Sequence, residues 1–274
     1  MTYFGFLFRF LLIPIIILLA VTIWENRKNK PTPGFRGGGA VWAAIGIHIL
    51  LAVVYTTPWD NYLVATGVWH YNPTLVTGIL FGYVPIEEYT FFVLETMLAG
   101  LWWWFLARHT SLTGRRRSVP NKPLVFLSTG LLVLPWLVST YVFFFGDITW
   151  TYLSITLFWA LPAIVVQLLF GADILWHYRK LVFWAILLPG TYLSLMDILA
   201  LKSTIWSIAP AQTTGVLFFG ILPLEEVVFF LLTNVMITFG MTLLLANGSQ
   251  ERLAEIREQA QAWKERAAFR PGSR

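Results

Sequence analysis

Seven long apolar stretches constrain this chain more than any other feature of its sequence. They cover approximately residues 3–24, 40–57, 74–106, 123–145, 150–170, 181–201 and 211–246. A helix that crosses a bilayer needs about 20 mainly apolar residues. Only 12% of the residues are charged, whereas an ordinary soluble domain has roughly 25%. The sequence therefore predicts an all-α polytopic membrane protein with about seven transmembrane helices, and it excludes a soluble globular domain.

The basic residues predict the orientation of these helices. Of the 19 Lys and Arg residues, all but Arg9 and Lys202 lie in 25–38, 107–122, 171–180 and the tail after residue 246. These regions are alternate loops of a seven-helix chain, and Lys and Arg concentrate on the cytoplasmic side. We therefore expect an integral, multi-pass protein with its N-terminus outside and its C-terminus in the cytoplasm. The same bias explains the triplet Arg115–Arg117, so no nucleic-acid partner is expected.

The tail has apolar residues at helical spacing between its charges, namely Leu253, Ile256, Ala260, Trp263 and Ala267. This pattern predicts an amphipathic helix on the cytoplasmic membrane surface. A plain solvated helix is the alternative.

The chain contains an internal repeat. At an offset of 137 residues, the matches are Tyr55 with Tyr192, Asp60 with Asp197, Trp69 with Trp206, Pro73 with Pro210, and Thr77-Gly78 with Thr214-Gly215. One extra Phe then shifts the offset to 138, at which the matches are Gly82 with Gly220, Pro85 with Pro223, Glu87-Glu88 with Glu225-Glu226, and Phe91-Phe92 with Phe229-Phe230.

The repeat divides the chain into four parts. Residues 1–110 form a first three-helix repeat, 111–148 a cytoplasmic loop and a linker transmembrane helix, 149–246 a second three-helix repeat, and 247–274 the tail. An odd number of crossings between the copies gives both the same orientation, as in a parallel repeat. Both glutamate pairs are therefore expected to approach from the same side.

The two glutamate pairs are the candidate functional groups, because ionisable residues within a bilayer are costly and mark functional sites by default. If the third and seventh helices begin near Thr74 and Ala211, the pairs lie roughly 20 Å along each helix, near mid-membrane. We favour this arrangement, one long helix kinked at Pro85 or Pro223. In the alternative, each proline begins a new helix and the glutamates occupy its first turn.

The expected chemistry follows from burial. Apolar surroundings favour the protonated form of a carboxyl group, so one member of a pair can act as an acid while its neighbour carries the charge. Aromatic faces around such a pair stabilise a carbocation. Residues expected to line the substrate are Phe91, Phe92, Phe229, Phe230, Trp69 and Trp206; those expected to support the site are Asp60, Asp197, Tyr55 and Tyr192. For most single aromatic residues, however, packing or an interface-belt position is the simpler explanation.

Other chemistries lack their motifs. The sequence has no dinucleotide-binding G-x-G-x-x-G, no P-loop and no H-E-x-x-H. Its four histidines are scattered and it has no cysteine, so no metal site is expected.

The duplicated P-[IL]-E-E-x-x-F-F, preceded by T-G-x-L-F and by an upstream Asp, Trp and Pro, resembles the non-flavin, membrane-integral lycopene cyclases. The resemblance covers residues 1 to about 246. It implies carotenoid biosynthesis by cyclisation of lycopene end groups, with a β-ring as the expected product. Such an enzyme is an intramolecular lyase or isomerase that acts on a lipid-soluble carotenoid without a cofactor, since substrate and product are isomers.

The resemblance implies that the catalytic residues are Glu87, Glu88, Glu225 and Glu226. It does not assign acid and base among them. The resemblance is also compatible with contact between this protein and other carotenoid enzymes. Two alternatives stay open, a proton-coupled transporter that uses the same glutamates as a relay and a carotenoid end-group hydratase.

Overall fold

The computed structural model describes residues 1–110 and 121–268, and the side chains of 263–268 are not part of that description. Seven helices among the described residues are long and apolar enough to cross a membrane. These spans are Tyr3–Arg27, Gly39–Ala65, Ile86–His109, Lys122–Phe145, Ile148–His177, Arg179–Lys202 and Leu224–Leu245. The prediction of an all-α, multi-pass membrane protein is confirmed.

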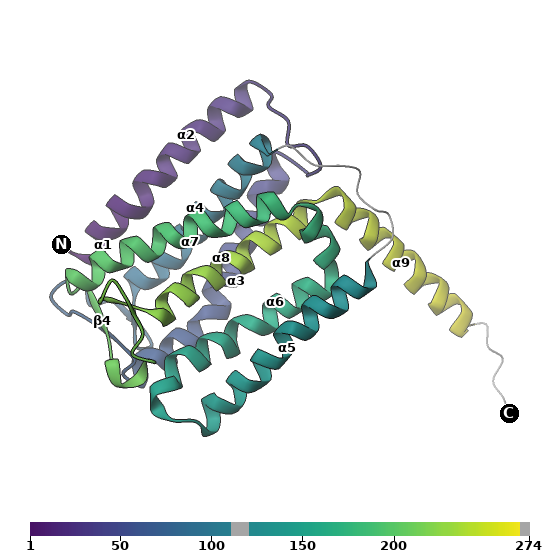
Figure 1. Cartoon of the computed structure of the whole chain (residues 1–274). Helices are drawn as coiled ribbons and strands as arrows, with labels where there is room; N and C mark the ends of the chain where they lie inside the picture. Colours follow the sequence, from purple (N-terminus) through teal and green to yellow (C-terminus); the bar gives the residue numbers. More distant parts are fainter. Residues whose placement is uncertain (111–120, 269–274) are drawn as a thin grey trace.

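The helices follow the chain in a simple order. They are α1 (Tyr3–Leu7), the π-helix η1 (Phe8–Leu12), α2 (Ile13–Arg27), α3 (Gly39–Ala65), α4 (Ile86–His109), α5 (Lys122–Phe145), η2 (Ile148–Trp150), α6 (Thr151–His177), α7 (Arg179–Lys202), η3 (Pro210–Gln212), α8 (Leu224–Leu245) and α9 (Asn247–Ala268). The helices α4 and α8 are the most enclosed of the spans, whereas α5 is the most exposed and packs mainly on α6 (Figure 1).

The preference for one long kinked helix through each glutamate pair is wrong. The helices α4 and α8 begin directly after Pro85 and Pro223, which are their N-caps. Proline lacks a backbone N–H and is favoured at the start of a helix. Each glutamate pair therefore lies in a first turn, at one end of its span rather than near the middle.

Each proline and the residues before it form a hairpin. The first hairpin pairs β2 (Leu80–Phe81) with β3 (Val84–Pro85), and the second pairs β5 (Leu217–Phe218) with β6 (Leu222–Pro223). The extra Phe of the second copy is Phe219, an exposed loop residue with a φ of 52°. The insertion thus lengthens a turn and leaves the register of the following helix unchanged.

A two-stranded sheet joins the two copies. The strands β1 (Trp69–Tyr71) and β4 (Trp206–Ile208) are antiparallel, with Trp69 opposite Ile208 and Tyr71 opposite Trp206. At the offset of 137, Trp69 corresponds to Trp206 and Tyr71 to Ile208. Each strand therefore pairs with its own repeat counterpart in a register that a local twofold axis would produce.

The tail begins as a helix that packs on the bundle. In α9, Ser249 and Arg252 are buried, and Arg252 forms a two-point ion pair with Asp173 of α6 at 2.6 and 2.9 Å. Further along, Ile256 is exposed, and Figure 1 shows α9 extending away from the bundle. The triplet Arg115–Arg117 lies outside the described residues.

Candidate active site

All four glutamates of the repeated motif are buried, with exposed fractions of 0 to 6%. They occupy the first turns of α4 and α8. The backbone N–H groups of a first turn and the helix dipole favour a carboxyl group there. The motif therefore places both pairs at equivalent ends of two equivalent helices.

The first glutamate of each pair bonds to the loop before its helix. Glu87 Oε1 accepts a hydrogen bond from the backbone N–H of Thr77 at 2.6 Å. Glu225 Oε1 accepts the equivalent bond from Thr214 at 2.7 Å. These two residues hold the hairpin segments against α4 and α8, and the two copies do this in the same way.

The second glutamate of each pair faces a cavity shared by both copies. Glu88 and Glu226 line one cavity of about 20 Å³. Glu88 Oε2 accepts hydrogen bonds from the hydroxyls of Tyr3 at 2.5 Å and Tyr71 at 3.0 Å. Glu226 Oε1 accepts one, from Tyr152 at 2.7 Å. The repeat is therefore asymmetric at these two carboxyl groups.

A third carboxyl group, that of Asp197, lines the same cavity. Its Oδ1 accepts a hydrogen bond from Trp206 Nε1 at 2.8 Å, while its Oδ2 has no partner among the described residues. The remaining wall is aromatic and consists of Tyr3, Trp69, Tyr71, Phe91, Trp206, Phe229 and Phe230.

The cavity is rich in carboxyl groups and poor in counter-charges. None of the ion pairs found among the described residues includes Glu88, Glu226 or Asp197. Burial of a charge without an opposite partner is costly, so a negative charge at this cavity depends on the hydroxyl and indole donors that face it. The arrangement suits proton donation and acceptance beside an apolar molecule.

A larger cavity of about 450 Å³ lies between α3, α4, α6 and α8. Phe229 lines both cavities and therefore stands where they meet. Glu95, two turns beyond Glu88 on α4, lines the larger one and accepts a hydrogen bond from Thr233 at 2.9 Å. Glu95 and Thr233 are repeat counterparts at the offset of 138.

The other residues singled out from the sequence lie around these cavities. Phe92 and Tyr55 line the larger cavity. Tyr55 bonds to the carbonyl of Trp159 at 2.8 Å, and Tyr192 bonds to that of Phe10 at 2.7 Å. Asp60 is fully buried, and neither of its carboxyl oxygens accepts a hydrogen bond from a described residue.

Sequence reasoning missed the three tyrosines and Glu95. Tyr3, Tyr71 and Tyr152 have no tyrosine at the repeat offset, and Glu95 corresponds to a threonine. A search for matching residues therefore passes over them. A second signal was available for Glu95, because it is a carboxyl group inside an apolar span.

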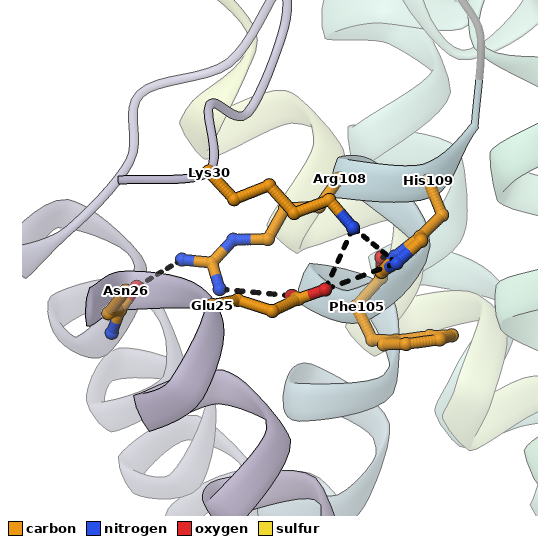
Figure 2. Close-up of polar contacts among 6 residues, drawn as sticks. All are labelled: Glu25, Asn26, Lys30, Phe105, Arg108 and His109. Carbon is orange, nitrogen blue, oxygen red and sulfur yellow. Dashed lines mark hydrogen bonds and ion pairs between the residues drawn. The ribbon is translucent and has the colours of Figure 1, made fainter. Parts of the chain in front are cut away.

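A separate polar cluster lies at the C-terminal ends of α2 and α4, away from the glutamate pairs (Figure 2). Glu25 is ion-paired with Lys30 at 2.8 Å and with buried Arg108 at 3.3 Å, and its Oε1 lies 3.1 Å from His109 Nε2. Arg108 also bonds to Asn26 and lies over the ring of Trp104 at 4.2 Å. His109 Nδ1 contacts the carbonyl of Phe105 at 2.7 Å, and its Nε2 contacts Lys30.

Comparison with known proteins identifies the family. A lycopene beta-cyclase of Halobacterium salinarum is 38% identical over 211 residues, which cover 76% of this chain and 84% of that protein. A bifunctional lycopene cyclase/phytoene synthase of Podospora anserina is 34% identical over 203 residues, and one of Aspergillus oryzae is 30% identical over 201. These matches cover 72% and 73% of this chain and 34% of each fungal protein. No family model and no solved structure matches the chain. With its duplicated glutamate motif and these relatives, the chain belongs to the non-flavin lycopene cyclase family.

Proposed function

We propose that this chain cyclises lycopene end groups to β-rings by proton transfer in the cavity between its two copies. The observation that carries the proposal is the convergence of Glu88 and Glu226, one from each copy, on a single buried cavity. The names of the relatives, lycopene beta-cyclase and bifunctional lycopene cyclase/phytoene synthase, support both the substrate and the β-ring.

The reaction needs one proton donor and one proton acceptor. A carboxylic acid delivers a proton to the terminal double bond of the end group, which leaves a tertiary carbocation. The neighbouring double bond attacks this cation, forms a carbon–carbon bond and closes a six-membered ring. A carboxylate then removes a proton from the ring cation, and its electrons form the ring double bond. Substrate and product are isomers, so the balance requires no electron carrier.

We assign Glu226 as the donor and Glu88 as the acceptor. Hydrogen bonds to a carboxylate favour its charged form. Glu88 receives two tyrosine hydroxyl donors and Glu226 receives one. Asp197 lines the same cavity as both glutamates, so it does not decide between them. The proton therefore resides more readily on Glu226.

The aromatic wall has two tasks in this mechanism. The faces of Phe229, Phe230 and Trp69 stabilise the cation through their quadrupoles, by about 2 kcal/mol or more per ring when water is excluded. The same rings keep water from the ring cation, because capture by water would give an alcohol in place of the cyclic alkene. Loss of a wall residue is expected to increase hydroxylated side product.

The orientation in the membrane is part of the proposal. The charge distribution favours an outside N-terminus and a cytoplasmic C-terminus. In a chain without cysteine, single cysteines at Asn61 and at Lys28 can be labelled separately from each side of sealed vesicles. We expect labelling of Asn61→Cys only from outside and of Lys28→Cys only from the cytoplasmic side; labelling of both from the same side would refute this orientation.

The division into two parallel three-helix repeats with a linker helix also stays a proposal, supported by the register between β1 and β4. Contact with other carotenoid enzymes is a further expectation, which co-purification from a carotenoid-producing membrane tests.

Expression in cells that accumulate lycopene tests the function. We expect conversion of lycopene to cyclic carotenoids with β-rings, and the purified protein in liposomes should do the same without flavin or nicotinamide. Unchanged lycopene with verified protein in the membrane would refute the proposal. A product with added water and no ring would favour an end-group hydratase.

A second experiment tests the assignment of donor and acceptor. In Glu88→Gln, protonation and ring closure still proceed, so the ring cation is released as a mixture of alcohol and double-bond isomers. In Glu226→Gln, lycopene stays linear, but its 1,2-epoxide, which opens with a weaker acid, still cyclises. The reverse pattern would exchange the two roles.

A further inference from the structure

The larger cavity is placed to hold a long apolar ligand. Its volume of about 450 Å³ lies in the range of about 300–1,000 Å³ that is usual for small-molecule sites. Three of its polar side chains have hydrogen-bond partners in the protein. Glu95 is bonded to Thr233, Gln167 to the carbonyl of Met236 at 2.9 Å, and His48 to that of Ala44 at 2.7 Å. The rest of the lining is largely aliphatic and aromatic.

The larger cavity and the cavity of the carboxyl groups share one aromatic side chain. Phe229 belongs to both cavity walls. Its ring is stacked on Trp59 at 5.2 Å and lies 6.1 Å from Trp159. A ligand that fills the larger cavity therefore has one end directly behind Phe229 and next to the Glu88–Glu226 cavity.

The other end of the cavity opens toward lipid. Leu51 of α3 and Val166 of α6 line it, yet their exposed fractions are 55% and 65%. Both residues lie in membrane spans, so the surface they expose faces hydrocarbon. Next to this opening, α3 and α6 are joined by Tyr55 and Trp159, each of which donates a hydrogen bond to the other's backbone carbonyl.

The opening continues into an apolar groove on the outer surface. Val166 also lines this groove, which has a volume of about 1,110 Å³ and runs between α5 and α6. Most of its lining is apolar, including Phe126, Val133 and Leu169. A hydrocarbon dissolved in the bilayer can therefore pass from this groove around Val166 into the cavity without meeting water.

We propose that the cavity between α3, α4, α6 and α8 binds the polyene chain of the substrate, and that the substrate enters it from the lipid between α3 and α6. This inference rests on the proposed function and names the path by which a linear carotenoid reaches the carboxyl groups. The Glu88–Glu226 cavity of about 20 Å³ has room for about one water molecule, so the end group reaches the carboxyl groups only when Phe229 and its aromatic neighbours move aside. The adjoining polyene then fills the larger cavity, and the rest of the chain remains in the groove.

Reversible blocking of the opening tests the path. Because the chain has no cysteine, Val166→Cys can be modified selectively in detergent with benzyl methanethiosulfonate and then restored with dithiothreitol. The matched control is Val138→Cys on α5, which is 53% exposed and lines neither the cavity nor the groove. Each protein is compared with itself, so folding differences between variants do not enter.

Two measurements are made on each protein, the initial rate of lycopene cyclisation in liposomes and the amount of lycopene that the protein retains on an affinity resin after washing with lycopene-free detergent. We expect modification of Val166→Cys to lower both at least tenfold, dithiothreitol to restore both, and Val138→Cys to be unaffected. Unchanged binding and rate after complete modification of Val166→Cys would overturn the path. If lycopene binds and modification blocks binding but no protein cyclises it, the path stands and the proposed function fails.

Discussion

Carboxyl groups at the two ends of α4 have opposite surroundings. At one end, Glu25 lies against the helix with Lys30, Arg108 and His109 around it. At the other end, Glu88 faces Glu226 and Asp197 across a cavity, and its hydrogen-bond donors are the uncharged hydroxyls of Tyr3 and Tyr71. Both carboxyl groups are buried, so the difference lies in their partners.

The difference separates a structural role from a chemical one. A buried carboxylate matched by basic groups is fixed in one charge state, because loss of its charge would leave those groups unpaired. A buried carboxyl group held by hydroxyls among other acids can change its protonation state at a smaller cost. Substitutions that keep the shape and remove the charge should therefore act on stability at the Glu25 end of α4 and on catalysis at the Glu88 end.

The largest expected effect is on catalysis at the Glu88 end of α4. Replacement of Glu226 by Gln removes the proposed acid and should lower consumption of lycopene by about 10²–10⁴-fold, and replacement of Glu88 by Gln removes the proposed base and should lower formation of the β-ring product by about the same factor. The apparent Tm in detergent should stay near that of the unmodified protein, because Gln can still accept from the tyrosine hydroxyls. Turnover and Tm are measured on the same preparations, and two active single variants would remove these residues from the mechanism.

The second largest effect is expected on stability at the Glu25 end of α4. Glu25→Gln leaves the guanidinium of Arg108 buried without its charge partner, which costs about 3–5 kcal/mol. We expect a clearly lower Tm and an almost unchanged turnover per folded molecule. The matched control is Lys30→Gln, because the Lys30 side chain is 32% exposed and its loss should cost about 1 kcal/mol or less. A catalytic defect in Glu25→Gln without a stability defect would contradict the comparison.

A smaller loss of stability is expected from the first glutamate of each pair. Glu87→Gln and Glu225→Gln replace the carboxyl acceptor of the Thr77 or Thr214 backbone N–H by an amide acceptor, and a hydrogen bond of this kind contributes about 0.5–1.5 kcal/mol. Thermal unfolding should show this loss in both variants to a similar degree. If either variant loses as much turnover as Glu88→Gln while remaining as stable as the parent, the division of roles within the pairs is wrong.

The smallest effect is expected from single hydroxyls. Tyr71→Phe removes one of two donors to Glu88, and Tyr152→Phe removes the donor found for Glu226. A loss of about 1.4 kcal/mol in the transition state corresponds to a tenfold lower kcat. We expect Tyr152→Phe to reach about this value and Tyr71→Phe to lose less, since Tyr3 still bonds to Glu88. Equal kcat values would show that the number of donors does not matter.

Much of this fold could be predicted because hydropathy reports membrane spans directly. The seven spans lie where apolar runs indicated them, although α4 and α8 start later than expected and α3 and α6 end later, at Ala65 and His177 instead of near residues 57 and 170. Hydropathy could not locate those starts, since the apolar residues from Thr77 to Pro85 look the same in a helix and in a hairpin. The positive φ of Gly78 and Gly82, together with the proline, decides between them.

The site was predictable only as far as the two copies agree. The repeat points to Glu88 and Glu226 because both copies keep them, but it cannot indicate which residues of other helices face them. Tyr3 comes from the N-terminal helix and Tyr152 from α6, and neither has a tyrosine at the repeat offset. Only the packing of the helices brings these hydroxyls to the glutamates. The roles of the four glutamates and the membrane orientation stay predictions.

One carboxyl cavity shared by both copies has a consequence for the order of events on a substrate with two identical ends. In the proposed mechanism, lycopene presents one end at a time to Glu88 and Glu226, and the other end points away along the polyene. To cyclise both ends, the half-finished molecule must leave, turn around in the bilayer and bind again. The one-ringed intermediate then competes with unreacted lycopene for the same site. The ratio of one-ringed to two-ringed product should therefore depend on how much lycopene the membrane contains.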